Sequence, residues 1–256
     1  MTRRCFYIEK IDPDADYVTL KGQTAHHVQS VLRLRSGDFL ELRDGCGEGW
    51  TGEIVDRDKD TVRVRVIERQ LLQTESPLQL TLAMAFARTD RMELVVRQAT
   101  ELGIHRFVAY RSKRSQYGLS AAQLEKRRKR WLTIAREAMC QCGRMKTPEI
   151  HLVPDLLKCL DEISHPDGTG TTLRLLALEG AERSGLADIR QSFPECSEVL
   201  AVIGPEGGWS SEEVQELLAV GFCAVHLGPR ILRLETAAVA FIALTQLLWG
   251  DFGSRT

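Results

Sequence analysis

The sequence predicts an α/β protein with two domains, a small all-β domain at residues 1–72 and a larger domain with a mostly parallel sheet at residues 73–256. Up to residue 72, apolar residues alternate within short segments, as they do in strands. From Leu78 onward, strand patterns alternate with helix patterns, which is the signature of a parallel sheet covered on both faces. With 256 residues, 43% of them hydrophobic and 27% charged, the chain can form two globular cores.

The all-β domain is expected to contain several strands and one short helix. Its strand segments are RCFYIE (4–9), FLELRD (39–44), WTGEIVD (50–56) and TVRVRVIER (61–69). TAHHVQSVLRLRSGD, residues 24–38, predicts a short helix and a turn. DGCGEG, residues 44–49, resembles the acidic glycine loop of Rossmann-type enzymes, but a strand pattern comes directly after it, so we assign it to a hairpin. QLLQTESP, residues 70–77, is expected to be a linker.

The larger domain is expected to alternate strands and helices to its end. The predicted strands are 78–86, 106–110, a short strand near 150, 173–179, 198–204 and 223–228. The predicted helices are 90–103, 120–141, one that begins at 154, 210–219 and 236–249. Asp90 and Glu93 are expected to form a capping box at the start of the first of these helices.

Positive charge is concentrated in the middle of the chain. Residues 86–146 carry 15 basic and 5 acidic side chains, although the net charge of the whole chain is −1. A solvated helix face is the alternative, but basic residues also occur outside the predicted helix, so we favour a contact with RNA or DNA. The arginines expected to bind RNA are Arg33, Arg35, Arg88, Arg91, Arg111, Arg114 and Arg128.

Several classes of protein are disfavoured. Seven cysteines without a C-x-x-C pair favour a reduced cytoplasmic protein, and we expect neither disulfides nor a bound metal. The first ten residues lack the apolar region of a secretory signal. The most apolar segment, residues 237–249, is too short to cross a membrane, so no membrane association is expected.

Two similar loops indicate the ligand site. IGPEGGWSSEE (203–213) and LGPRILRLETAA (227–238) each leave a predicted strand through Gly-Pro and enter a helix. Ligands of open α/β sheets bind at the carboxyl ends of the strands. Glu206 would repel a phosphate, and no Walker or dinucleotide motif is present, so a nucleoside that carries a positive sulfonium fits better. The alternative is a tight turn in which Ser210 and Glu213 only form a capping box.

These two loops, with ATELGI (99–104) and REAMCQCGR (136–144), closely resemble the RsmE family. HHVQSVLRLRSGD and DGCGEGWTGEI resemble the PUA-like RNA-binding domain of that family, so the resemblance covers nearly the whole chain. It implies a SPOUT-class enzyme that transfers a methyl group from S-adenosylmethionine to N3 of one uridine in 16S ribosomal RNA of the small subunit. It also implies a small PUA-like β-barrel, a C-terminal trefoil knot and a homodimer. Leu234, Trp209 and Gln98 stand where the family usually has Thr, Phe and Lys.

The resemblance and the chemistry together assign the site residues. The expected cofactor-binding residues are Leu178, Glu179, Ile203, Gly204, Pro205, Gly207, Gly208, Leu227, Gly228, Ile231, Leu232, Leu234, Glu235, Thr236 and Ala237. Uridine N3 must lose its proton before it attacks the methyl carbon, so positive charge is needed near the uracil oxygens. Arg144 is the first candidate for that charge, with Arg233 and Glu206 as further catalytic candidates and Glu206 as the candidate general base.

The sequence leaves several alternatives open. Arg144 could bind phosphate only, Glu206 could only make the loop rigid, and Glu235 could serve the dipole of the last helix. At the level of function, the alternatives are a SPOUT-class methyltransferase that acts on another RNA site, a nicotinamide or nucleotide enzyme, and a non-catalytic RNA-binding protein.

Overall fold

The computed structural model describes residues 4–9, 12, 15–114, 120–160, 163, 172–179 and 184–253. The chain forms two compact units. The first comprises Met1–Glu75 and Arg136–Thr147, and the second comprises Ser76–Ala135 and Pro148–Thr256. The first change of unit therefore falls inside the predicted linker, whereas the return of residues 136–147 to the first unit has no counterpart in the sequence patterns.

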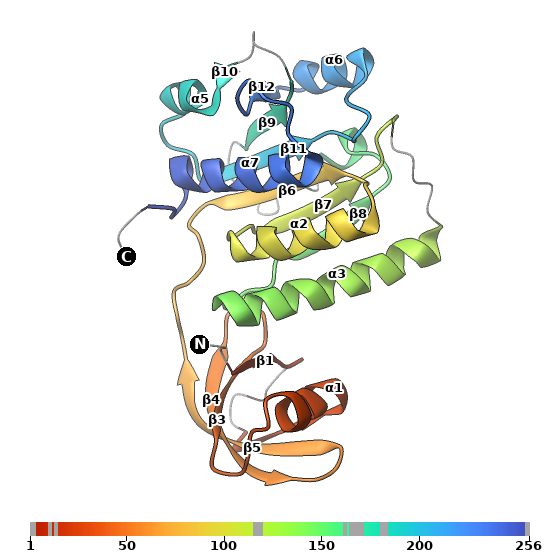
Figure 1. The fold of residues 1–256 in the computed structure, drawn as a ribbon. Helices are drawn as coiled ribbons and strands as arrows, with labels where there is room; N and C mark the ends of the chain where they lie inside the picture. Colours follow the sequence, from red (N-terminus) through yellow and green to blue (C-terminus); the bar gives the residue numbers. More distant parts are fainter. Residues whose placement is uncertain are drawn as a thin grey trace. The chain divides into compact units, whose positions relative to one another are not determined.

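The first unit is built on a five-stranded sheet with the order β1-β3-β4-β5-β2 (Figure 1). The strands are β1 (Cys5–Tyr7), β2 (Tyr17–Lys21), β3 (Phe39–Arg43), β4 (Gly49–Arg57) and β5 (Thr61–Gln70). β1 pairs parallel to β3, and the other pairs are antiparallel. In β5, Val62 and Val64 are buried and the arginines next to Val64 are exposed, as the alternation predicts.

The helical and hairpin expectations for this unit are confirmed. α1 (Gly22–His26) continues into a single π-helical turn, η1 (His27–Val31). β3 and β4 pair as a hairpin, with Gly45 at φ 72° and Gly47 at φ 119° in the connection, so the glycines of residues 44–49 serve a turn. β2 was not among the predicted strands.

The C-terminal part of α3 (Ala121–Cys142) and the residues after it pack within this unit. The Arg136 guanidinium lies 3.9 Å from the centre of the Tyr7 ring. The Thr147 N–H donates to the Gly45 carbonyl at 2.9 Å, and Cys46 forms an isolated β-bridge with Lys146. These contacts join residues about a hundred positions apart, which explains why local patterns did not reveal them.

The second unit contains a seven-stranded parallel sheet with the order β10-β12-β9-β11-β6-β7-β8 (Figure 1). The strands are β6 (Gln79–Ala85), β7 (Arg106–Tyr110), β8 (Glu149–Val153), β9 (Leu173–Ala177), β10 (Ser184–Gly185), β11 (Glu198–Ile203) and β12 (Cys223–His226). β7 is buried throughout, and only the first residue of β6 is exposed, as expected for strands covered on both faces.

The helices of the second unit cover this sheet. They are α2 (Thr89–Glu101), the N-terminal part of α3, α5 (Leu186–Ser192), α6 (Ser211–Ala219) and α7 (Leu234–Trp249). α2 and α7 lie side by side (Figure 1). Met92, Val96, Phe241 and Ile242 belong to one buried cluster with residues of the strands. This confirms the predicted α/β architecture, while the trefoil knot stays a prediction.

Some local predictions were wrong or incomplete. α2 begins at Thr89 with Arg88 as N-cap and no side-chain cap, so Asp90 lies in the first turn and forms no capping box with Glu93. The helix predicted to start at Pro154 begins later, with a 3₁₀ turn at Leu157–Cys159, and Leu160 and Ile163 after it are α-helical. The other residues of 161–171 lie outside the described residues. β10 and α5 had no predicted counterpart, because each is short and lacks a periodic pattern.

Candidate active site

A cavity of about 1050 Å³ lies at the carboxyl ends of β9, β11 and β12. The loops after β11 and β12 form much of its wall, and residues of α2, α6 and α7 and of the end of β9 contribute the rest. All the lining residues belong to the second unit. In a parallel sheet the carboxyl ends of all strands share one edge, so two loops 24 positions apart in sequence meet at one site.

The first loop depends on glycine because an aromatic ring packs against it. A Cβ atom added at Gly204 would lie 2.6 Å from atoms of the Trp209 ring. That ring stacks on Tyr110, with centroids 6.3 Å apart and an interplanar angle of 17°, and its N–H donates to the Ala177 carbonyl at 3.1 Å. The loop ends in the predicted capping box of Ser210 and Glu213. The loop therefore contains the capped turn and also lines the cavity, while its role in ligand binding stays a prediction.

The second loop exposes apolar side chains toward the cavity. Gly228 has φ 100°, a conformation that other residues rarely adopt, and its N–H donates to His226 Nδ1 at 3.1 Å. Ile231 lines the cavity although 82% of its surface is exposed, and Leu232 lies beside it. An apolar side chain so exposed at a cavity wall is typical of a surface that a ligand covers.

Arg91 bridges the two sides of the cavity. Its Nη1 lies 2.7 Å from Glu206 Oε1 in the first loop, and its Nε lies 3.9 Å from Glu235 Oε2 in the first turn of α7. Glu235 Oε2 is buried and makes no hydrogen bond within the described residues. The sequence predicted that Arg91 binds RNA, but the structure places it in the cavity wall beside the candidate general base.

The predicted cofactor-binding residues are largely brought together. All of them line the cavity except Gly207, Glu235 and Thr236, and the catalytic candidates Glu206 and Arg233 line it as well. The lining residues that were not among the predicted cofactor-binding or catalytic residues are Arg91, Ala177, Trp209, Ser210, Ser211, Val214, Gln215, Leu218, His226, Pro229 and Arg230. Val214 and Leu218 are spaced four apart on α6, a helical signal that could have identified this wall.

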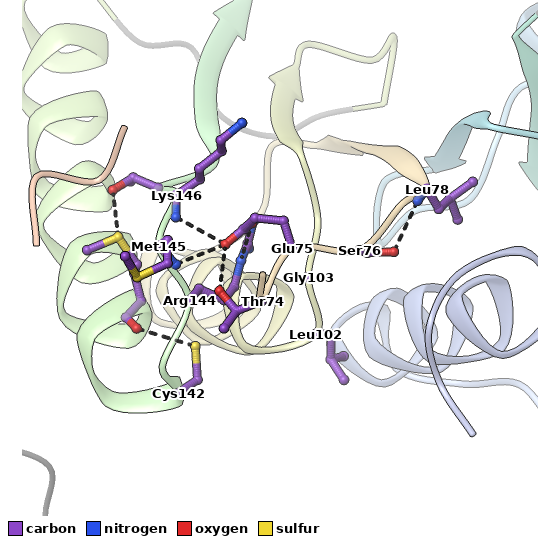
Figure 2. Close-up of polar contacts among 12 residues, drawn as sticks. Thr74, Glu75, Ser76, Leu78, Leu102, Gly103, Cys142, Arg144, Met145 and Lys146 are labelled. Carbon is purple, nitrogen blue, oxygen red and sulfur yellow. Dashed lines mark hydrogen bonds and ion pairs between the residues drawn. The ribbon is translucent and has the colours of Figure 1, made fainter. Parts of the chain in front are cut away.

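Arg144 belongs to the first unit and is held there by Glu75 (Figure 2). Its Nε and Nη2 lie 3.0 and 2.6 Å from Glu75 Oε2, while the Met145 and Lys146 N–H groups donate to Oε1. Burial raises the pKa of Glu75, but the hydrogen bonds and charge of Arg144 and the two N–H donors outweigh it, so the pKa lies below its ordinary value. The Arg144 carbonyl also accepts from Arg43 at 2.7 Å.

The other candidate RNA-binding arginines are dispersed. Arg33 and Arg35 lie in the first unit, and Arg33 has φ 54°. In the second unit Arg88 pairs with Asp90 and Arg128 pairs with Glu125. Arg111 and Arg114 come after β7, and Arg114 Nη1 donates to the Gly207 carbonyl at 3.2 Å.

Across the described parts of the chain, no group of three or more His, Cys, Asp or Glu side chains is arranged to hold a metal ion. None of the helices in the same parts is both long enough and apolar enough to cross a membrane.

Comparison with known proteins assigns both units. Residues 74–246 match the family model of the RNA methyltransferase domain, and residues 20–67 match that of the RNA methyltransferase PUA domain. Ribosomal RNA small subunit methyltransferase E of Bacillus subtilis is 31% identical over 242 residues, covering 93% of this chain and 94% of the relative. The protein of the same name from Synechocystis is 34% identical over 231 residues, covering 90% and 72%.

A solved structure agrees with this assignment. The crystal structure of ribosomal RNA small subunit methyltransferase E from Neisseria gonorrhoeae, bound to S-adenosylmethionine, superposes with a TM-score of 0.85 at 31% identity. The match covers 98% of this chain and 99% of that one. The chain therefore belongs to the RNA methyltransferase family that includes ribosomal RNA small subunit methyltransferase E, the RsmE family that its paired loops resemble.

Proposed function

We propose that this protein methylates N3 of a uridine in 16S ribosomal RNA of the small subunit, with S-adenosylmethionine as methyl donor. Family membership and the names of the relatives support methylation of small-subunit RNA. The observation that carries the choice of atom is the Arg91–Glu206 pair at the wall of the cavity.

The cavity suits S-adenosylmethionine in size and chemistry. Its volume of about 1050 Å³ lies just above the range of roughly 300–1,000 Å³ for small-molecule sites, so the cofactor fits with room for part of the target nucleotide. Ile203, Leu227 and Leu232 would cover the adenine, and Glu179 would accept hydrogen bonds from the ribose hydroxyls. When bound, S-adenosylmethionine supplies a methyl group on a positively charged sulfonium, and the carboxylates of Glu206 and Glu235 favour that charge nearby.

The Arg91–Glu206 pair matches the edge of uracil that carries N3. On that edge an N–H group lies between two carbonyl oxygens. Glu206 presents an acceptor for the N–H, and Arg91, which touches it, presents donors for a carbonyl oxygen. In this arrangement Glu206 takes the N3 proton, while Arg91 stabilises the negative charge that develops on the oxygens.

Two other arginines keep proposed roles. Arg233 is an exposed cavity residue at the N-terminal end of α7, where it can meet the RNA backbone. Arg144 is proposed to contact uracil or phosphate, and RNA must then share or displace its partner Glu75. We further propose that the first unit binds RNA, that the target base is extruded from the RNA to enter the cavity, and that the protein acts as a cytoplasmic homodimer.

The test is to incubate the purified protein with labelled S-adenosylmethionine and small ribosomal subunits that lack the modification, then digest the RNA and identify the methylated nucleoside. We expect 3-methyluridine. Label in another nucleoside would overturn the choice of N3 and keep the class of reaction, whereas unlabelled RNA despite bound S-adenosylmethionine would overturn the substrate.

A further inference from the structure

The end of β7 and the described residues after it, Arg111–Arg114, are tied to the first cavity loop at several points. The Tyr110 hydroxyl donates to the Ile203 carbonyl at 2.8 Å, at the point where β11 ends and the cavity loop begins. In the middle of that loop, Arg114 Nη1 donates to the Gly207 carbonyl at 3.2 Å. The cavity loop and the basic segment Arg111–Arg114 are therefore held together, although about 90 residues separate them in sequence.

Glu213 is the centre of this connection. It is only 8% exposed, and its two carboxylate oxygens serve different elements. Oε1 accepts from the Ser112 hydroxyl at 2.7 Å and from the Lys113 N–H at 2.9 Å. Oε2 accepts from the Ser210 N–H at 3.0 Å, and the Glu213 N–H donates back to the Ser210 hydroxyl at 3.1 Å. One buried carboxylate thus joins the basic segment to the end of the cavity loop.

The charges of the basic segment are not equivalent. The Lys113 ammonium lies 3.0 Å from Glu212 and 3.4 Å from Glu216, so acids of α6 neutralise it. The guanidinium groups of Arg111 and Arg114 are exposed and form no ion pair within the described parts of the chain. Lys113 therefore anchors the segment to α6, and the two arginines present positive charge beside the cavity loop.

We propose that Glu213 is a positioning residue that couples RNA binding at Arg111 and Arg114 to cofactor binding in the cavity. The proposal rests on the proposed function. An RNA phosphate bound by the two arginines restricts the motion of the basic segment. Through the contacts at Glu213 and Gly207, this also restricts the motion of the first cavity loop, which covers the cofactor. By reciprocity, a bound cofactor orders the segment for RNA.

Binding measurements test the coupling without turnover. The dissociation constant of S-adenosylhomocysteine is measured for the full-length protein with and without saturating small ribosomal subunits that lack the modification. For the unsubstituted protein we expect the subunits to tighten binding at least about fivefold, the lower end of typical coupling between sites. An unchanged dissociation constant would overturn the proposal.

Two matched variants separate coupling from structure. Ser112→Ala removes the hydroxyl that donates to Glu213 Oε1. In this variant the subunits should tighten binding of S-adenosylhomocysteine less than about twofold, while the affinity for S-adenosylhomocysteine alone stays within about twofold of that of the unsubstituted protein. Ser197→Ala, at an exposed position outside the cavity, is the matched control and should keep the tightening. Equal tightening in Ser112→Ala and in the unsubstituted protein would overturn the role of Glu213.

Arg114→Ala is a further variant that tests the coupling, and it does not disturb the core because this side chain is exposed. It should also lose the tightening, and persistence of the full effect would count against the connection through Gly207. Absence of tightening in an unsubstituted protein that still forms 3-methyluridine would overturn this proposal and leave the proposed function standing. Failure of the unsubstituted protein to bind S-adenosylhomocysteine would overturn both.

Discussion

At the scale of single residues, the cavity places a carboxylate and a guanidinium where the proposed reaction needs an acceptor and a positive charge. Glu206 and Arg91 are 2.7 Å apart, and both are partly exposed. Their mutual attraction therefore adds little to stability, since ion pairs at such exposure contribute about 0–1 kcal/mol. Their effect is expected in catalysis instead.

Glu206→Gln should lower the rate of methyl transfer by about 10²- to 10⁴-fold, because the amide cannot take the proton. The measurement is single-turnover transfer to unmodified small subunits over a range of pH. Glu195→Gln, at an exposed position outside the cavity, is the control. A Glu206→Gln protein with an unchanged rate at every pH would exclude Glu206 as the base.

Arg91→Ala should separate catalysis from cofactor binding. We expect the rate of transfer to fall by about 10²- to 10³-fold, as when one group that stabilises a developing oxyanion is lost. Affinity for S-adenosylmethionine should fall by no more than about fivefold, because the ion pairs are partly exposed. Arg97→Ala, at an exposed position of the same helix, should change neither quantity. An equal loss in rate and affinity would reduce Arg91 to a structural role.

Glu75 carries a prediction for stability. Its pKa in the folded protein is lowered from 4.5, so its contribution is complete above about pH 4.5 and is lost as the pH falls through the folded value. Glu75→Gln should lower the free energy of unfolding by about 2–3 kcal/mol at neutral pH, because it weakens the hydrogen bonds of a largely buried guanidinium.

The measurement for Glu75 is urea unfolding at a series of pH values. The difference between Glu75→Gln and the unsubstituted protein should shrink below pH 4.5. Glu68→Gln, at an exposed position of β5, serves as control. A difference that stays constant down to low pH would show that ionisation of Glu75 does not stabilise the fold.

At the scale of elements, two strand-to-helix loops form the cavity, and glycine permits each of them for a different reason. Gly204 leaves room for the Trp209 ring, whereas Gly228 supplies a positive φ of 100°. The first requirement is close packing and the second is backbone conformation. Substitution of either glycine by a larger residue should therefore weaken ligand binding before it destabilises the core.

Gly204→Ala and Gly228→Ala should each weaken binding of S-adenosylmethionine by about 5- to 150-fold, corresponding to about 1–3 kcal/mol of overpacking or backbone strain. Gly221→Ala is the matched control, because Gly221 has φ 88° in the turn after α6 and does not line the cavity. It should lower stability without changing affinity. Titration calorimetry measures the affinity of the three variants for S-adenosylmethionine. Unchanged affinity in Gly204→Ala and Gly228→Ala would show that the two loops do not bind the cofactor.

At the scale of the whole molecule, the chain crosses between its two units three times, and every residue that lines the cavity belongs to the second unit. A ligand that binds only the folded state stabilises the part it binds by mass action. Cofactor binding should therefore stabilise the second unit and leave the stability of the first unit unchanged.

At a concentration one hundred times its dissociation constant, S-adenosylmethionine should stabilise the second unit by about 2.7 kcal/mol. Hydrogen exchange followed by mass spectrometry should show slower exchange in residues 76–114 and 184–253, and no comparable change in residues 15–75. ATP at the same concentration is the control. Protection confined to residues 15–75 would place the cofactor site outside the cavity.

Local sequence patterns were sufficient to predict the α/β architecture with its all-β first domain, most of the strands and helices, and the two Gly-Pro loops. These features are local: alternation, helical periodicity and turn residues act over a few neighbouring positions. The loops also indicated most of the cavity wall, because parallel strands present their carboxyl ends at one edge of the sheet.

The pairs of distant side chains that meet could be identified only in the folded chain. Arg91 bridges the two cavity loops, Glu75 holds Arg144 in the first unit, and Glu213 joins the basic segment to the cavity loop. Each contact depends on the packing of elements that lie about 70 to 145 positions apart in the chain. No periodicity encodes such pairings, because the partner of a charged side chain is chosen by the geometry of the folded chain and not by its neighbours in sequence.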